Sequence, residues 1–472
     1  MLTHIANGDS RLSYWSRVRE FAVPPSMIET ATARRALGDW AGACAAAGVD
    51  VDLNPRTVTH DYGQDVAARL RDDLRHLAPD LLRWHMPRIA PDGLLRPGLT
   101  ITLARYEAAG RDGPYPVHLV VRTPPAWADA GQRIGLALWD GSRGEVDGCR
   151  HPRPRPSRRF RFDLHRHLWD ARRAGELRIR SGAEAPSAAE PSVRDPELSG
   201  LVPLERGCAV DRWAEEAGIV LRAEGRSDGA VLVRFGARRR LVLHVAPGAE
   251  ADGVGHGPPG PRLAGVNGDD RACSSLPVLP DAATWVLPDL ELIRAGAIEA
   301  DRLHPLVASA LVPDHVPSAS ARAPERAGQP RLVDCRGVQH RIGLVDGVLA
   351  PLDHDPAELR REELLVALTG TPLPCLQAID EAHRRPDCLS GVRERLDHGD
   401  IAGALSVVEG LLGPDALLRE GALRDELEEA ARRRITYGLY RSGLTGPGPR
   451  RIRLSDRRRP SRELRSRNAT FF

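Results

Sequence analysis

The sequence contains no lysine, and all 67 of its basic residues are arginines. A chain without lysine cannot form the Schiff base on which pyridoxal-phosphate enzymes depend. It also lacks the lysine with which a Walker A loop or a protein-kinase strand holds phosphates. These protein classes are therefore excluded, while the arginine bias itself fits a GC-rich coding sequence.

Aromatic residues and cysteines are also scarce. Aromatics make up 4% of the 472 residues, so a core must be built mainly from leucine, valine and alanine. The seven cysteines are odd in number and scattered, which fits free thiols better than a disulfide framework. No apolar run reaches the roughly 18 residues of a membrane span, and the first ten residues lack a signal-peptide layout. We therefore expect a cytoplasmic protein with no membrane segment.

Glycine (45) and proline (39) are abundant, which predicts many turns and several linkers. The patterning predicts an α+β multidomain protein, in which helical N- and C-terminal regions flank small, mainly antiparallel sheet modules. The expected segments are a helical N-terminal region (1–92), a small antiparallel sheet module (98–180), a linker (181–200), a small α+β module (201–246), a Gly/Pro-rich irregular segment (247–284), a helical segment (285–311), a second linker (312–330), a short hairpin followed by a helical domain (331–440) and a basic mobile tail (441–472).

Periodicity places individual elements within these segments. A helical pattern over 63–86 contains Pro79, which should divide it. Alternating patterns predict strands at 99–103, 134–138, 160–164, 219–223, 230–235, 240–245, 331–333 and 339–345. Helices are expected at 168–174, 210–217, 356–368, 374–385, 391–398, 400–411 and 415–436.

Two stretches near opposite ends of the chain are almost alike, Gly38-Asp39 and Gly399-Asp400. Each follows an arginine-rich helical pattern and precedes small apolar residues. Glycine can end a helix at positive φ, and aspartate can cap the next one, so both predict a tight corner between helices. The spacing resembles the turn of tetratricopeptide-type helical hairpins, which implies peptide or protein binding, although no period of about 34 residues connects the two.

Two Cys/His pairs form a candidate metal site, Cys149 with His151 and His165 with His167. Residues two apart on an extended chain face the same way, so the pairs could offer one sulfur and three nitrogens to a tetrahedral zinc ion. The alternative is two solvent-facing pairs in an arginine-rich segment, and no other cofactor is predicted. Further cysteines and histidines are spaced too irregularly to predict a site: Cys335, His340, His354, Cys375, His383, Cys388 and His398.

Positive charge is concentrated in two places. Residues 150–180 hold eleven arginines against three acidic residues, and aromatics lie among them. Such a segment can bind nucleic acid or another anion, but Phe160 and Phe162 alternate, so they can instead point into a core. The candidate anion-binding residues are Arg158, Arg159 and Arg161, together with Arg457, Arg458 and Arg459 in the tail.

Two further stretches, SYWSRVREFAVPP at 13–25 and LLRWHMP at 81–87, resemble uncharacterised proteins of GC-rich actinobacteria. That resemblance implies a bacterial cytoplasmic setting and assigns no activity, cofactor or catalytic residue. Because HExxH and GxSxG motifs are absent, the leading hypothesis is a non-catalytic protein-interaction or regulatory protein that binds a protein partner through helical faces. The alternatives are nucleic-acid or polyanion binding and a metal-dependent enzyme, and the oligomeric state is left open.

Overall fold

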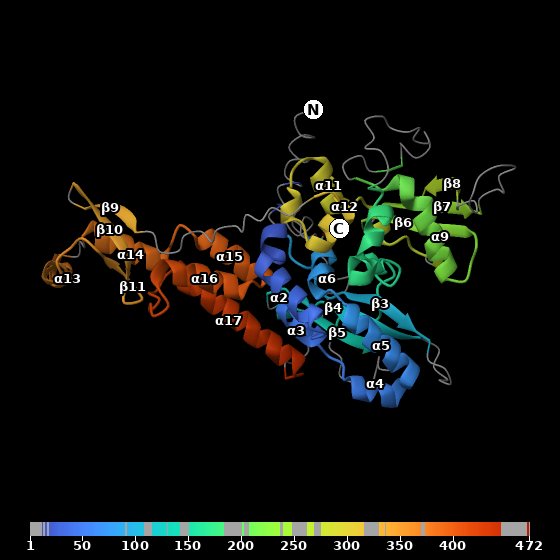
Figure 1. Cartoon of the computed structure of the whole chain (residues 1–472), viewed down its shortest axis with the longest axis horizontal. Helices are drawn as coiled ribbons and strands as arrows, with labels where there is room; N and C mark the ends of the chain where they lie inside the picture. Colours follow the sequence, from blue (N-terminus) through green and yellow to red (C-terminus); the bar gives the residue numbers. More distant parts are fainter. Residues whose placement is uncertain are drawn as a thin grey trace, which may run out of the picture. The chain divides into compact units, whose positions relative to one another are not determined.

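The computed structural model describes residues 12, 15–16, 18–89, 92–107, 116–129, 131–141, 151–183, 201–202, 207–236, 239–247, 262–268, 275–315, 330–335, 337–369, 373–444 and 470–471. The chain divides into two compact units. Unit 1 comprises Met1–Trp127, Arg133–Pro317 and Gly446–Phe472, and unit 2 comprises Ala128–Gln132 and Ser318–Thr445. Both combine helices with small sheets, so the predicted α+β class is confirmed (Figure 1).

The N-terminal part of unit 1 is a series of short helices. They are α2 (Pro25–Ala36), α3 (Trp40–Ala46), α4 (Pro55–Tyr62), α5 (Gln64–His76) and α6 (Pro79–His85). Gly38 has φ +76° and the Asp39 carboxylate accepts the Gly42 N–H at 2.8 Å, which is the corner geometry that the pattern predicts. The expected 63–86 helix is divided at Pro79, as predicted.

A four-stranded sheet packs with these helices around the largest core of unit 1. Its strands are β1 (Val49–Val51), β3 (Thr100–Tyr106), β4 (Val117–Arg122) and β5 (Ile134–Trp139), in the order β1-β5-β4-β3, with a 3-10 turn, η1 (Ala126–Ala128), between β4 and β5 in the chain. The β3-β4 and β4-β5 pairs are antiparallel, but β1 runs parallel to β5. The region predicted as helical at 1–92 does hold these helices, and it also contributes the edge strand β1 and β2 (Arg88–Ile89), which pairs with β12 (Thr470–Phe471).

The alternating residues at 160–164 do not form the predicted strand. The chain turns there, since the N–H groups of Leu164 and His165 bond the carbonyls of Arg161 and Phe162, and a single bridge joins Arg161 to Thr102. Phe160 and Phe162 are nevertheless buried, as the core interpretation expected. The helix expected at 168–174 is replaced by η2 (Arg166–Leu168) and η3 (Ala171–Glu176), which α7 (Leu177–Arg180) follows.

A second α+β module of unit 1 begins with η4 (Val210–Arg212) and α9 (Trp213–Ala223). The residues predicted as a strand at 219–223 belong to α9, because the buried positions Trp213, Ala217, Val220 and Leu221 recur at helical spacing. Helix α9 packs on the antiparallel sheet of β6 (Gly229–Phe235), β7 (Arg239–Ala246) and β8 (Arg262–Gly268) (Figure 1). Strand β8 lies within the segment 247–284, which was expected to be irregular. Then follow α10 (Asp281–Thr284), α11 (Pro288–Arg294), η6 (Ala300–Arg302) and α12 (Pro305–Leu311).

Unit 2 follows the sequence pattern, except that the helix predicted at 415–436 begins only at Ala422. Strands β9 (Arg331–Cys335), β10 (Val338–Val345) and β11 (Val348–Pro351) form an antiparallel sheet in chain order. Its helices are α13 (Pro356–Thr369), α14 (Pro374–Arg384), α15 (Leu389–His398), α16 (Ile401–Leu412) and α17 (Ala422–Arg441). Gly399 is left-handed and Asp400 accepts the Gly403 N–H at 2.9 Å, so the second corner repeats the first.

The tail predicted at 441–472 lies largely outside the described residues, which here end at Leu444 and resume in β12. Across the part of the chain that the structure covers, no helix combines the length and the apolarity that crossing a membrane requires.

We predict that Asp39→Ala lowers the free energy of unfolding by about 0.5–2 kcal/mol, because the first turn of α3 loses its capping acceptor. Asp39→Asn keeps a side-chain oxygen in the same place and should cost clearly less. Urea unfolding of the full-length variants measures both, and equal losses would show that the carboxylate acts through its charge on Arg34 and not as a cap.

Candidate metal centre

Three metal-ligating side chains from different elements converge in unit 2. Cys335 ends β9, His354 follows β11 by three residues, and Cys375 lies in the first turn of α14. Their ligand atoms all lie within 4.8 Å of one another. Among the described residues, no other group of three or more Cys, His, Asp or Glu side chains converges in this way. The cluster could therefore hold a metal ion.

Local sequence explains how each side chain reaches this place. Gly337, at φ +82°, makes the tight turn after β9, and its N–H bonds the Asp334 carboxylate at 3.0 Å. Pro374 takes the first position of α14, which puts Cys375 where backbone N–H groups are unpaired and the helix end is positive. That end of a helix would stabilise a thiolate ligand once a metal ion has displaced the thiol proton.

Both cysteines are buried, Cys335 at 3% and Cys375 at 0% exposure. Burial, followed by the hydrogen bond to Cys335, raises the pKa of the Cys375 thiol to about 11. The metal-free thiol therefore keeps its proton at neutral pH, and a metal ion must displace it in order to bind. Around the two cysteines lies only a small apolar cluster of Leu373, Val333 and Leu376.

Spacing along the chain gave no signal for this cluster. Eighteen residues separate Cys335 from His354, and twenty separate His354 from Cys375. The close pairs of cysteines or histidines that mark common zinc motifs are absent, because two further strands and a helix lie between the ligands. Only the pairing of β9, β10 and β11 and the packing of α14 on that sheet bring the three together.

The predicted metal residues lie in unit 1, where the three that the structure describes make other contacts. Cys149 lies outside the described residues. His151 is buried, with Nε2 2.9 Å from the Thr123 carbonyl, and the Arg153 N–H donates to its Nδ1 at 3.2 Å. Burial lowers the pKa of His151, so the ring is neutral and both nitrogens are engaged.

His165 and His167 do lie together, with ring centroids 5.6 Å apart. His165 Nε2 lies 3.2 Å from the Glu216 carboxylate, to which Arg180 also donates. Burial alone would raise the pKa of Glu216, but the close contacts with His165 and Arg180 hold that pKa below its ordinary value. Burial and the neighbouring His165 lower the pKa of His167. The two histidines form part of a buried polar network with Glu216. Among the described residues they belong to no group of three possible metal ligands.

The predicted anion-binding arginines of 150–180 are engaged within unit 1. Arg158 donates to the Leu276 carbonyl at 3.1 Å, and Arg159 forms an ion pair with the buried Asp281. Arg161, only 7% exposed, binds Asp163 and Glu224. The tail residues Arg457, Arg458 and Arg459 lie outside the described residues.

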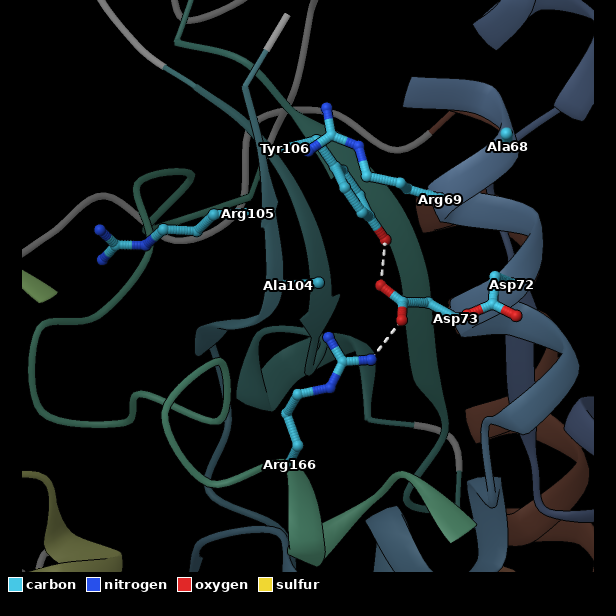
Figure 2. Close-up of a pocket in the computed structure, with 8 residues that line it drawn as sticks. All are labelled: Ala68, Arg69, Asp72, Asp73, Ala104, Arg105, Tyr106 and Arg166. Atoms are coloured by element: carbon cyan, nitrogen blue, oxygen red, sulfur yellow. Dashed lines mark hydrogen bonds and ion pairs between the residues drawn. The ribbon is translucent and has the colours of Figure 1, made fainter. Parts of the chain in front are cut away.

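Unit 1 also has a surface hollow of about 410 Å³ between α5 and β3 (Figure 2). Asp73 is its centre, and its carboxylate accepts hydrogen bonds from Tyr106 and Arg166. Figure 2 shows Arg105 pointing away from this carboxylate, and its guanidinium pairs with Asp163 instead. The charged groups that line the hollow are thus paired within unit 1.

No family model matches the chain, and neither a curated protein nor a solved structure matches it. A function must therefore be argued from side-chain chemistry. Two thiols and an imidazole are the ligands preferred by soft and borderline divalent ions, which distinguishes the Cys335 cluster from the carboxylate-rich sites that hold magnesium or calcium.

Proposed function

We propose that this chain is a zinc-binding, non-catalytic interaction protein in which unit 2 is the docking module. The convergence of Cys335, His354 and Cys375 carries the proposal. Zinc fits because thiolate and imidazole are its usual protein ligands, and because it needs no redox partner. Two thiolates also balance the charge of a divalent ion, which suits a buried site.

Zinc at this place would join the sheet of unit 2 to its helices. Cys335 belongs to β9 and Cys375 to α14, and α14 packs against all three strands. The apolar cluster at this junction has only five members, the two cysteines included. A structural zinc ion contributes on the order of 10 kcal/mol, several times the roughly 1.5–3 kcal/mol of one buried leucine. The ion would therefore dominate the junction.

We predict that the full-length protein retains about one equivalent of zinc after dialysis, measured by elemental analysis. Cys335→Ser and Cys375→Ser should each reduce this to less than about a tenth of an equivalent, because each removes a thiolate ligand. Zinc uptake should also fall as the pH is lowered, since protons compete for the sulfurs. Cys388→Ser is the matched control, because Cys388 is a free thiol of the same unit outside the cluster. Wild-type protein without zinc would refute the proposal, as would equal zinc in all four proteins.

Exposed apolar side chains favour unit 2 as the docking module. Of the thirteen large hydrophobic residues that are exposed among the described residues, eleven belong to this smaller unit. They are Leu332, Val338, Leu344, Val345, Val348, Leu364, Leu405, Leu417, Ile435, Leu439 and Leu444. Exposed apolar side chains mark an interaction site where they form one contiguous surface.

The C-terminal half of α17 offers the most defined of these surfaces. Ala431, Ile435 and Leu439 are exposed and spaced four residues apart, so they form one stripe along the helix. Exposed arginines accompany the stripe at 432, 434 and 441. An apolar stripe with basic flanks complements an acidic amphipathic helix, and we commit to that chemistry for the partner.

We predict that the full-length protein binds a synthetic helical peptide with leucines four residues apart and glutamates beside them, measured by fluorescence anisotropy. Ile435→Glu combined with Leu439→Glu should weaken binding at least tenfold, about 1.4 kcal/mol, because it places like charge on the stripe. Leu364→Glu, at another exposed leucine of unit 2, is the control and should bind normally. A light-scattering mass twice that of one chain, lost in the double variant, would show that the stripe binds a second copy and would overturn the assignment.

A second candidate function, nucleic-acid binding, is favoured by a group of arginines near Asp281 in unit 1. Arg234 and Arg240 lie directly opposite each other on β6 and β7, an unfavourable pairing of like charges. Burial, then the charges of Arg159 and Arg153, lower the pKa of Arg96 to about 10, and burial with Arg159 and Arg240 lowers that of Arg234. Asp281 opposes both effects and is already paired with Arg159. Bound phosphates would relieve this excess of positive charge.

We predict that binding of the full-length protein to a labelled DNA duplex weakens steeply with salt. Removing two phosphate contacts by Arg234→Gln with Arg240→Gln should reduce the slope of log K against log salt by roughly 1.8. Arg56→Gln with Arg75→Gln removes the same charge from exposed positions elsewhere in unit 1 and should leave the slope nearly unchanged. Equal slopes for both double variants would assign any binding to net charge alone.

A further inference from the structure

The further inference concerns His340, which lies beside the Cys335 cluster and is not one of its three converging residues. We propose that His340 is the fourth ligand of the metal and closes the centre as a two-thiolate, two-imidazole tetrahedron. The inference rests on the zinc proposed above. It goes further because a centre with four protein ligands has no open position for a substrate or a reactive water.

Strand register places His340 on the correct face of the sheet. His340 on β10 lies opposite Val333 on β9. Directly opposed residues of an antiparallel pair share a face, and Cys335, two residues beyond Val333, shares it too. The intervening positions Asp334 and Gln339 are exposed on the other face. Cys335 and His340 are therefore diagonal neighbours on one surface.

Helix α14 covers the same surface. Cys335, Val333, Leu373, Cys375 and Leu376 form one apolar cluster, and α14 also contacts β10 and β11. The face that carries His340 is consequently the face on which Cys375 lies.

The four side chains already touch in two pairs. His340 Nδ1 lies 2.8 Å from His354 Nε2, with ring centroids 4.2 Å apart, and the two cysteine sulfurs lie within 4.8 Å of each other. Ligand atoms around one tetrahedral zinc ion lie roughly 3.3–3.8 Å apart, given bonds of about 2.0–2.3 Å. The His340–His354 pair needs to open by only about 0.5–1 Å to reach this spacing.

One other role for His340 explains the same contact. A histidine that binds metal through one ring nitrogen usually donates its other N–H to an acceptor, and His340 could be that acceptor for His354. In that arrangement the fourth position would hold water. The buried thiols favour a protein ligand instead, and His340 is the side chain that already lies against a member of the group, with Nδ1 2.8 Å from His354 Nε2.

Cobalt(II) substitution of the full-length protein distinguishes the two roles, because the visible absorption of cobalt reports which atoms bind it. His340→Cys should retain one equivalent of cobalt and gain sulfur-to-cobalt charge-transfer intensity, since a third thiolate enters the set. His340→Ala should change the ligand-field bands and weaken binding by more than roughly 100-fold, beyond the 10- to 100-fold loss typical of a residue that only orients a ligand. Gln339→Ala, the adjacent residue on the opposite face, should match the wild type.

Two results would overturn the assignment of His340. One is a His340→Ala spectrum identical to the wild type, even with weaker binding, because the ligand set would then be unchanged. The other is His340→Cys without added charge-transfer intensity, a result that remains decisive where His340→Ala does not fold. In either case the loss of metal from Cys335→Ser would leave the zinc proposal intact, whereas wild-type protein that binds neither zinc nor cobalt would remove both.

Discussion

The stability of unit 2 depends on the junction between its sheet and its helices, where two thiols are buried. Cys335 and Cys375 are fully enclosed there, yet the apolar side chains around them number only three, Val333, Leu373 and Leu376. The larger core of the unit is made mainly by α14, α15, α16 and α17 and receives little from the strands. Hydrophobic burial therefore holds the helices together, while the attachment of β9–β11 needs another source of stability. The proposed ion would supply it.

Unit 1 instead stabilises its buried polar groups by pairing them with groups of opposite charge or with hydrogen-bond donors. The carboxylate of Asp289 is fully buried and receives Arg19 at 3.0 Å and the Trp84 indole N–H at 3.0 Å. Asp80 is equally buried and bonds His304 at 3.0 Å. Losing one member of such a pair leaves an uncompensated charge in the core, which costs about 3–5 kcal/mol. Each carboxylate therefore stabilises unit 1 only while its partner is in place.

The sequence predicted the features that depend on residues close together in the chain. The Gly-Asp corners, the division at Pro79 and the helices of unit 2 follow from capping, ring geometry and periodicity within one or two turns of chain. The misassigned 219–223 segment shows where such rules fail, since a short apolar run such as Ile219-Val220-Leu221 fits a strand or a helix equally well. Strand β1 was missed because its partner, β5, lies more than eighty residues away. The metal cluster was missed for the same reason, as only sheet register and helix packing bring Cys335, His354 and Cys375 together.

The Arg19–Asp289 pair also bears on how the chain is made. The two residues are 270 positions apart, so Arg19 emerges from the ribosome well before its carboxylate is synthesised. At about 5–20 residues per second, the delay is roughly 15–50 seconds. Throughout that interval the first helical residues, with Trp15 and Val18 that later become buried, have no finished core to join. The cluster that encloses Trp15 and Val18 includes Leu292, so it can be completed only after α11 has been translated.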